Sequence, residues 1–327
     1  MKVPGLAAGA ALALVLTACG GGPSNSAASS TASKLTLYTC VSDSTIQPVI
    51  TAFEKSEPGS TVDLFRAPTG QLNARVAADT RAGGLKADVV WGCDPLTMQA
   101  YVHQKLVGGW LPAEADAIPA QYRTADYVGA HLLYMVAVHR TSVPAPTAWS
   151  DLAGPAYGKV AVPDPTVAAS ALGALGWFAA NPAYGLGFYR KLHSSGAVQV
   201  STPDDVTTGV AQGIYDAGMT TSNSGYAAKK AGSPVDVVWP KPGAVAIYGP
   251  IALATHTPHA RAAKAFLTFV ISDAGQRVIG ASGSYPTRPG VAGPTIPPGA
   301  PVVEPDWASI GVTKAAIEQR YKQVFGG

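Results

Sequence analysis

The sequence has few charged residues and very little cysteine. Charged side chains make up 13% of the 327 residues, and the 23 basic residues nearly balance the 20 acidic ones. Nucleic-acid binding needs clustered Lys and Arg, and the chain has no basic run and no alternation of basic and aromatic residues, so no nucleic-acid partner is expected. The three cysteines lack metal-ligand spacing, which argues against a structural zinc site.

The motifs of common extracellular hydrolases are also absent. The chain contains no G-x-S-x-G, S-x-x-K or H-E-x-x-H sequence. His256 and His259 could ligate a metal, but Thr257-Pro258 between them is typical of a helix start, and a capping role is favoured. We therefore expect no cofactor and no enzymatic activity. A hydrolase is the disfavoured alternative, and a structural or adhesive lipoprotein is a third class.

Long apolar runs are absent except near the N-terminus. Lys2 precedes an apolar stretch from Gly5 to Leu16, and Leu16-Thr17-Ala18-Cys19 has the form of a bacterial lipoprotein cleavage site. This pattern predicts a signal peptide over residues 1–18, because the stretch is shorter than the roughly 20 residues that cross a bilayer. Cys19 would then carry the lipid of an extracytoplasmic, membrane-anchored protein. The alternative is an ordinary small residue in an apolar segment.

Residues 19–33 contain no large apolar side chain. Their Gly, Ser, Ala, Thr, Asn and Pro composition cannot form a core and predicts a flexible tether behind the lipidated cysteine. The folded part is expected to begin at Lys34. Its length of roughly 290 residues is enough for two domains of about 150 residues each.

From Lys34 onward, strand-like and helix-like segments alternate in two runs. The first run predicts strands at 35–39, 61–65 and 87–91 and helices at 46–53, 71–82 and 96–105. A long strand at 132–138 leads into a second run, with strands at 159–162, 198–201, 217–220 and 235–239 and helices at 166–180, 188–193 and 204–212. A strand at 244–254 and a helix at 258–271 follow.

This alternation predicts an α/β fold of two lobes with mostly parallel sheets, joined by two crossing strands that act as a hinge. The predicted boundaries are 34–137 for lobe 1, 138–243 for lobe 2, 244–275 for the return to lobe 1, and 276–327 for a C-terminal segment that packs on lobe 2. We expect a ligand between the lobes, beyond the carboxyl ends of the strands, in a chain that acts as a monomer.

Polar residues follow most of the predicted strands, where they could bind that ligand. Hydroxyl groups and helix N-termini in such turns favour an anion, although each Ser, Thr or Asp could equally be a helix cap. The candidates are Thr39, Cys40, Ser42, Asp43, Arg66, Thr69, Gly70, Asp94, Asp164, Thr166, Ser201, Thr202, Ser222, Asn223 and Tyr226.

Some of these candidates suggest particular contacts. Arg66 is the basic residue of the set and could pair with a carboxylate or a phosphoryl group, or remain solvated. Asp43, Asp94 and Asp164 could receive an amine or cap helices. Tyr226 could stack on the ligand or simply pack on its own helix.

Cys40 and Cys93 are the cysteines left once Cys19 is assigned to the lipid. Disulfides persist outside the cytoplasm, and both residues end strands that are expected to be neighbours in one sheet. We expect a disulfide at the floor of the cleft, with two separate buried thiols as the alternative. Closing a loop of this length would stabilise the fold by about 4 kcal/mol on the chain-entropy account.

A series of short motifs covers nearly the whole mature chain. They are Leu35-Thr36-Leu37-Tyr38, Ala52-Phe53-Glu54-Lys55, Thr69-Gly70-Gln71-Leu72, Ala87-Asp88-Val89-Val90-Trp91, Trp149-Ser150-Asp151-Leu152, Gly158-Lys159-Val160, Pro163-Asp164-Pro165-Thr166, Pro234 to Pro240, His259 to Phe269, Ser272-Asp273-Ala274-Gly275-Gln276 and Tyr285-Pro286-Thr287-Arg288-Pro289. In this order they resemble the ABC-importer solute-binding proteins for ferric iron, phosphonate and thiamine. The resemblance implies a type II periplasmic-binding fold that closes on its ligand and delivers it to a permease with its ATPase.

The resemblance leaves the ligand open. Ferric binders of the group use adjacent tyrosines after a late second-lobe strand, often with a histidine in the first turn. Here that place holds Ser222-Asn223-Ser224 with Tyr226 alone, and the first turn has Cys40 and Asp43 but no histidine. We therefore expect a small organic anion or zwitterion, such as a phosphonate or phosphate ester. Ferric iron with Tyr226 as a ligand, and then thiamine or a polyamine, are the alternatives.

Overall fold

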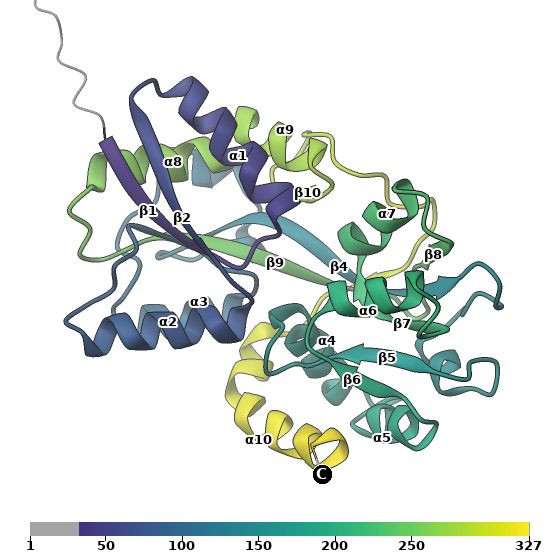
Figure 1. Cartoon of the computed structure of the whole chain (residues 1–327). Helices are drawn as coiled ribbons and strands as arrows, with labels where there is room; N and C mark the ends of the chain where they lie inside the picture. Colours follow the sequence, from purple (N-terminus) through teal and green to yellow (C-terminus); the bar gives the residue numbers. More distant parts are fainter. Residues whose placement is uncertain (1–32, 327) are drawn as a thin grey trace, which may run out of the picture. The chain divides into compact units, whose positions relative to one another are not determined.

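The predicted alternation of strands and helices is present in three dimensions (Figure 1). The structure is a computed structural model that describes residues 33–326. The predicted signal peptide, Cys19 and the tether up to residue 32 lie outside the described residues. The first strand, β1 (Ser33–Thr39), begins one residue inside the predicted tether.

The first lobe is a parallel group of strands covered on both faces by helices. Its strands are β2 (Ser60–Arg66), β1 and β3 (Val89–Trp91), and its helices are α1 (Asp43–Ser56), α2 (Thr69–Arg81), α3 (Pro95–His103), α8 (Ala260–Ile271) and α9 (Asp273–Ala281). Leu37 of β1 packs with α1 and α8, whereas the next residue, Tyr38, packs with α2 and α3. Alternate side chains of β1 therefore enter two different cores.

The second lobe repeats this design with shorter elements. Its strands are β7 (Ala217–Thr221), β5 (Val160–Pro163), β6 (Val198–Val200) and β8 (Val235–Val238), and its helices are α4 (Ala169–Ala180), α5 (Gly187–Ser194), α6 (Pro203–Ala211) and α7 (Ser222–Lys230). β5 runs parallel to both β6 and β7. An aromatic core lies beneath them, in which Phe178 and Phe188 stack with their ring centroids 4.4 Å apart.

One predicted helix starts later than expected. The sequence predicts a helix from Thr166, but α4 begins at Ala169. The carboxylate of Asp164 accepts hydrogen bonds from both the backbone N–H and the hydroxyl of Thr166, at 2.7 and 2.8 Å. These bonds hold the segment in a turn before the helix can begin.

Two long strands belong to the sheets of both lobes. They are β4 (Val128–Arg140) and β9 (Ala244–Leu253), at the places where the sequence predicts the crossings. The strand order is β2-β1-β3-β9-β4-β7-β5-β6, so this antiparallel pair lies at the centre of one continuous path. Since both strands are shared, the lobe boundaries near 137 and 243 stay predictions.

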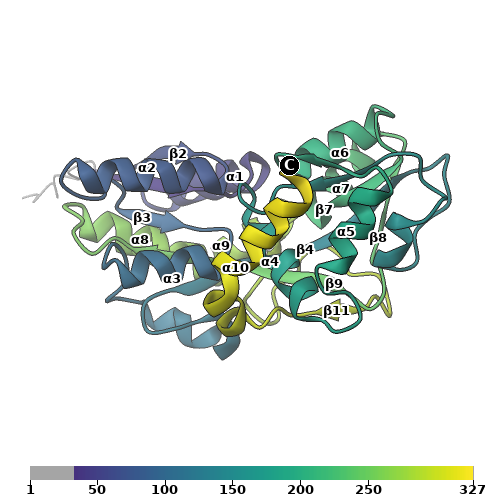
Figure 2. The same ribbon diagram turned by 90° about the horizontal axis from the view of Figure 1, so that it is seen from below.

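The C-terminal segment contacts both lobes. β10 (Tyr285–Pro286) pairs with β4, and β11 (Val302–Val303) pairs with β9. The last helix, α10 (Trp307–Phe325), packs against α4 and α5 and also touches α3 (Figure 2). Short 3-10 helices lie at Ala113–Ala117, Ala120–Tyr122 and Trp149–Ala153. Within residues 33–326, none of the helices combines the length and apolar character needed to cross a bilayer.

Candidate functional site

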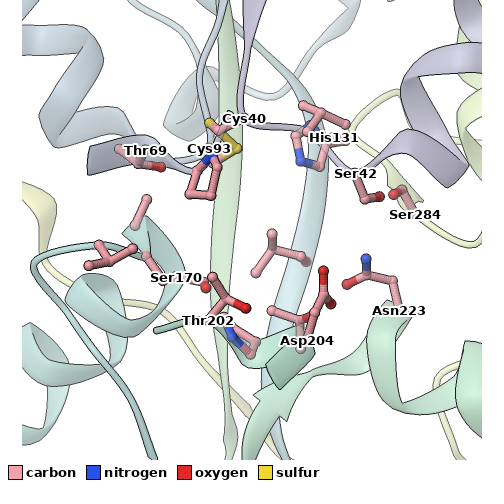
Figure 3. A pocket seen from close by; sticks show the side chains of 18 of the residues that line it. Cys40, Ser42, Thr69, Cys93, His131, Ser170, Thr202, Asp204, Asn223 and Ser284 are labelled. Atoms are coloured by element: carbon pink, nitrogen blue, oxygen red, sulfur yellow. A yellow bond between two sulfur atoms is a disulfide. The ribbon is translucent and has the colours of Figure 1, made fainter. Parts of the chain in front are cut away.

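A pocket lies where the carboxyl ends of strands from both lobes face each other (Figure 3). Its free volume is about 110 Å³, which is below the roughly 300–1,000 Å³ of sites for drug-sized ligands. The pocket therefore suits a small solute. The predicted site residues that line it are Cys40, Ser42, Arg66, Thr69, Thr202 and Asn223.

The predicted disulfide between Cys40 and Cys93 is confirmed. The two Cα atoms are 5.9 Å apart, and both residues line the pocket. The bond joins the turn after β1 to the turn after β3, and thus fixes two parts of the pocket wall on lobe 1. Bridging residues 53 positions apart restricts the unfolded chain, a contribution to stability of about 4 kcal/mol on the chain-entropy account.

Helix N-termini from both lobes surround the pocket. First-turn or cap residues of α1, α2, α4, α6 and α7 line it. α6 is capped by Thr202, whose hydroxyl accepts from the Asp205 N–H at 3.2 Å. By contrast, no side-chain cap is present on α1, α2, α4 or α7, and the cap positions of α2 and α4 hold Pro68 and Ala168, which have no side-chain acceptor. Partial positive charge therefore faces the pocket.

Arg66 lies at the edge of this pocket in a fixed orientation. Its Nε donates to the backbone oxygen of Val41 at 3.1 Å, and one terminal nitrogen lies 3.6 Å from a carboxylate oxygen of Asp43. The Arg66 side chain is 29% exposed, so part of its charge faces the cleft. Asp43 pairs with Arg66 and does not line the pocket.

The other predicted site residues do not line the pocket. They are Thr39, Asp43, Gly70, Asp94, Asp164, Thr166, Ser201, Ser222 and Tyr226. Several make contacts that shape the turns instead. Thr39 donates to the Trp91 carbonyl at 2.7 Å, and the hydroxyl of Tyr226 accepts from the Trp239 indole at 2.9 Å. Ser201 is exposed, whereas Ser222 is buried at the start of α7.

Asp94 caps α3. One of its oxygens accepts from the Thr97 N–H at 2.8 Å, and the side chain is completely buried. This burial raises the pKa of the Asp94 carboxyl, because the charged form loses its hydration. The capping alternative considered for Asp94 from the sequence matches this geometry.

Gly70 serves a contact between the lobes. Its N–H donates to the backbone oxygen of Val167 at 3.1 Å, across from α2 to the loop before α4. A Cβ at this position would lie 3.3 Å from the Thr166 backbone oxygen. The absence of a side chain thus allows the two backbones to approach each other, rather than a backbone to approach a ligand.

Several residues that line the pocket were not predicted from the sequence. His131 and Leu133 come from β4, Ser170 and Asp204 come from the first turns of α4 and α6, and Ser284 comes from the loop before β10. His131 is only 2% exposed, and its Nδ1 lies 3.0 Å from the indole nitrogen of Trp91. A histidine within the apolar sequence of β4 was the available signal.

Comparison with known proteins identifies the class of this site. The sequence model of the bacterial extracellular solute-binding proteins matches residues 35–284. The chain belongs to this family. Membership confirms the predicted function class, a binding protein that supplies a small molecule to an ABC permease. No curated protein matches the chain.

Solved structures confirm the type II periplasmic-binding fold of this solute-binding protein. AfuA from Actinobacillus pleuropneumoniae, with fructose-6-phosphate bound, has a TM-score of 0.81 at 16% identity over 90% of this chain and 98% of that chain. The periplasmic binding protein P5PA has 0.79 at 18% over 89% and 99%. Iron-bound HitA from Pseudomonas aeruginosa has 0.75 at 20% over 88% and 99%. At these identities the likeness shows the fold alone.

The solute-binding protein offers little to a metal ion. Among residues 33–326, no three or more His, Cys, Asp or Glu side chains are grouped so that they could hold one. His259 precedes α8, in agreement with the predicted helix start, and its Nδ1 lies 3.1 Å from a carboxylate oxygen of Asp88. The cleft itself contains one carboxylate, that of the exposed Asp204.

Proposed function

We propose that this solute-binding protein captures a small organic anion or zwitterion in the pocket between its lobes and passes it to its permease without any catalytic step. The observation that carries the proposal is the convergence of four uncapped helix N-termini, those of α1, α2, α4 and α7, on one pocket. Backbone N–H groups and the helix dipole both favour an anion there.

The electrostatic free energies of the charges around the pocket favour an anion over a cation. A charge at a helix terminus is worth about 0.3–1 kcal/mol when exposed and up to ~2 kcal/mol when partly buried. Asp43 lies in the first turn of α1 and pairs with Arg66, so it offsets the charge of both. The uncapped ends of α2, α4 and α7, which come from both lobes, still outweigh the exposed carboxylate of Asp204. Asp204 can still receive an ammonium group at one side of the pocket, and this is why a zwitterion is included.

Ferric iron is a weaker candidate. The hydroxyl of Tyr226 is hydrogen-bonded to the Trp239 indole, and Tyr226 does not line the pocket. Hard Fe³⁺ prefers several anionic oxygen ligands, whereas Asp204 is the one carboxylate among the described residues that line this pocket. Thiamine and polyamines are cations and meet the same helix ends.

The leader supports a proposal for the location of the protein. The residues before Cys19 have the form of a lipoprotein signal, and residues 19–33 have the composition of a tether. We propose that the mature protein is held at the outer surface of the membrane by a lipid on Cys19 and acts there as a monomer.

A thermal-shift panel tests the proposed ligand class. The mature protein is heated alone and with fructose 6-phosphate, phosphoethanolamine, ferric citrate, thiamine or spermidine. A ligand at 100 times its Kd adds about 2.7 kcal/mol to the free energy of unfolding, so a bound anion should raise Tm by a few degrees. Sodium citrate is the control for ferric citrate, because citrate is itself an organic anion. A rise with thiamine or spermidine alone, or with ferric citrate but not with citrate, would contradict the proposal.

A further inference from the structure

The imidazole of His131 is held in one orientation at the floor of the pocket. It projects from β4, and the indole N–H of Trp91, a fully buried residue of β3, points at its Nδ1 over 3.0 Å. The two rings also meet edge to face, with centroids 5.6 Å apart. Figure 3 shows the ring beside the pocket, across from Asp204 and Asn223.

Gly249 of β9 provides the space for this ring. A Cβ at position 249 would clash with Cε1 of His131 and lie 2.6 Å from its Nδ1. Three neighbouring strands thus fix the imidazole together. β4 carries the His131 side chain, β3 supplies the hydrogen bond from Trp91, and β9 leaves space for the ring at Gly249. The ring cannot rotate without losing the Trp91 bond or meeting the β9 backbone.

The Trp91 contact determines which ring nitrogen carries the hydrogen. An indole N–H can only donate, so Nδ1 of His131 must be the acceptor. A neutral imidazole then has its hydrogen on Nε2. Burial also lowers the pKa of His131 to about 4, because the cationic form would lose its hydration, and the ring is uncharged at neutral pH.

We propose that Nε2–H of His131 is a fixed, uncharged donor that binds an oxygen of the captured anion. This inference rests on the proposed function and names a residue that helps to determine which ligands the pocket binds. Within the described chain, Trp91 is the sole hydrogen-bond partner of the ring, so Nε2 remains for the ligand in the pocket that the ring lines.

A donor at this position disfavours metal ions and ammonium groups beside the His131 ring. A protonated Nε2 has no lone pair, so it can neither ligate a metal ion nor accept from an ammonium group. A zwitterion would therefore bind with its oxyanion at His131 and its ammonium group toward Asp204, which lines the opposite side.

Two measurements test this proposal, the tautomer of His131 and the affinity of the protein for an anionic probe. Long-range ¹H–¹⁵N spectra of the mature protein should show His131 as the Nε2–H tautomer. Its Nε2–H resonance should shift on titration with inorganic phosphate, fructose 6-phosphate or phosphoethanolamine. His131→Leu should weaken the binding of the same probe about tenfold, the usual scale for a lost hydrogen bond to a charged group. His139→Leu, the same change on β4 outside the pocket, should alter binding less than about twofold.

Trp91→Phe is a second variant that keeps His131 in place. It removes the indole donor, so the Nδ1–H tautomer should appear in the spectrum and the affinity for the probe should fall. An Nδ1–H tautomer in the wild-type protein overturns the proposal. So does probe binding that His131→Leu leaves unchanged, although anion capture itself then stands. If none of the three probes binds the wild-type protein, the proposed function fails and the role of His131 with it.

Discussion

Burial sets the charge state of His131, and this has a consequence for stability. The ring is 2% exposed, and its pKa falls to about 4 in the folded protein, against about 6.5 in an unfolded chain. Between these values the unfolded chain binds a proton that the folded protein does not. The free energy of unfolding therefore falls as the pH drops from about 6.5 toward 4.

Urea unfolding at pH 7.0 and pH 4.5 measures this effect. The wild-type protein should lose roughly 2–3 kcal/mol more between the two pH values than His131→Leu, which has no group to titrate at this site. Other titrating groups are shared by both proteins and cancel in the difference. Equal losses in the two proteins would mean that His131 titrates normally in the folded state.

The sequence could indicate which turns form the site but not which side chains face the ligand. Arg66 and Thr202 follow strands and do line the pocket. Asp94 and Tyr226 follow strands too, yet their oxygens bond within the protein. A cap and a ligand contact use the same residue types, and only the direction of the side chain separates them. His131 lies in the middle of a strand, and its exposure to the pocket depends on how distant strands pack.

A negative charge at the N-terminus of α7 should change helix stability and anion affinity in opposite directions. Asn223 is the second residue of α7, whose N-terminus has no side-chain cap. Asn223→Asp places a negative charge there with almost no change in shape. The charge should stabilise the helix by about 0.3–1 kcal/mol. It should also weaken the binding of fructose 6-phosphate about tenfold or more, because two anions would share the site.

Urea unfolding and calorimetric titration of the Asn223→Asp protein measure these two effects. Asn181→Asp is a matched control, because Asn181 follows the C-terminus of α4 and does not line the pocket. It should leave the affinity unchanged. If Asn223→Asp binds the anion as well as the wild-type protein does, α7 does not contribute to the site.

Most elements could be predicted because their apolar residues repeat at the period of a strand or a helix. α1 buries Ile46, Val49, Ile50 and Phe53 at helical spacing. α10 lacks such a stripe, since Ile310 and Tyr321 are its fully buried residues, and this helix was not predicted from the sequence. The late start of α4 depends on side-chain hydrogen bonds of Asp164, which periodicity does not report.

At the scale of the whole molecule, the lobes share more than a hinge. β4 and β9 belong to both sheets, the Gly70 N–H binds the Val167 oxygen of the other lobe, and α10 touches helices of both. We propose that β4 and β9 flex where the lobes meet. A ligand that contacts residues of both lobes would then favour the closed arrangement, because it binds that state better.

The cleft is proposed to capture an organic anion. Native mass spectrometry tests it directly, after incubation of the mature protein with fructose 6-phosphate, phosphoethanolamine, ferric citrate, thiamine and spermidine at equal concentrations. We expect one bound molecule whose mass corresponds to a phosphate-bearing compound. A dominant complex with iron, thiamine or spermidine would contradict it.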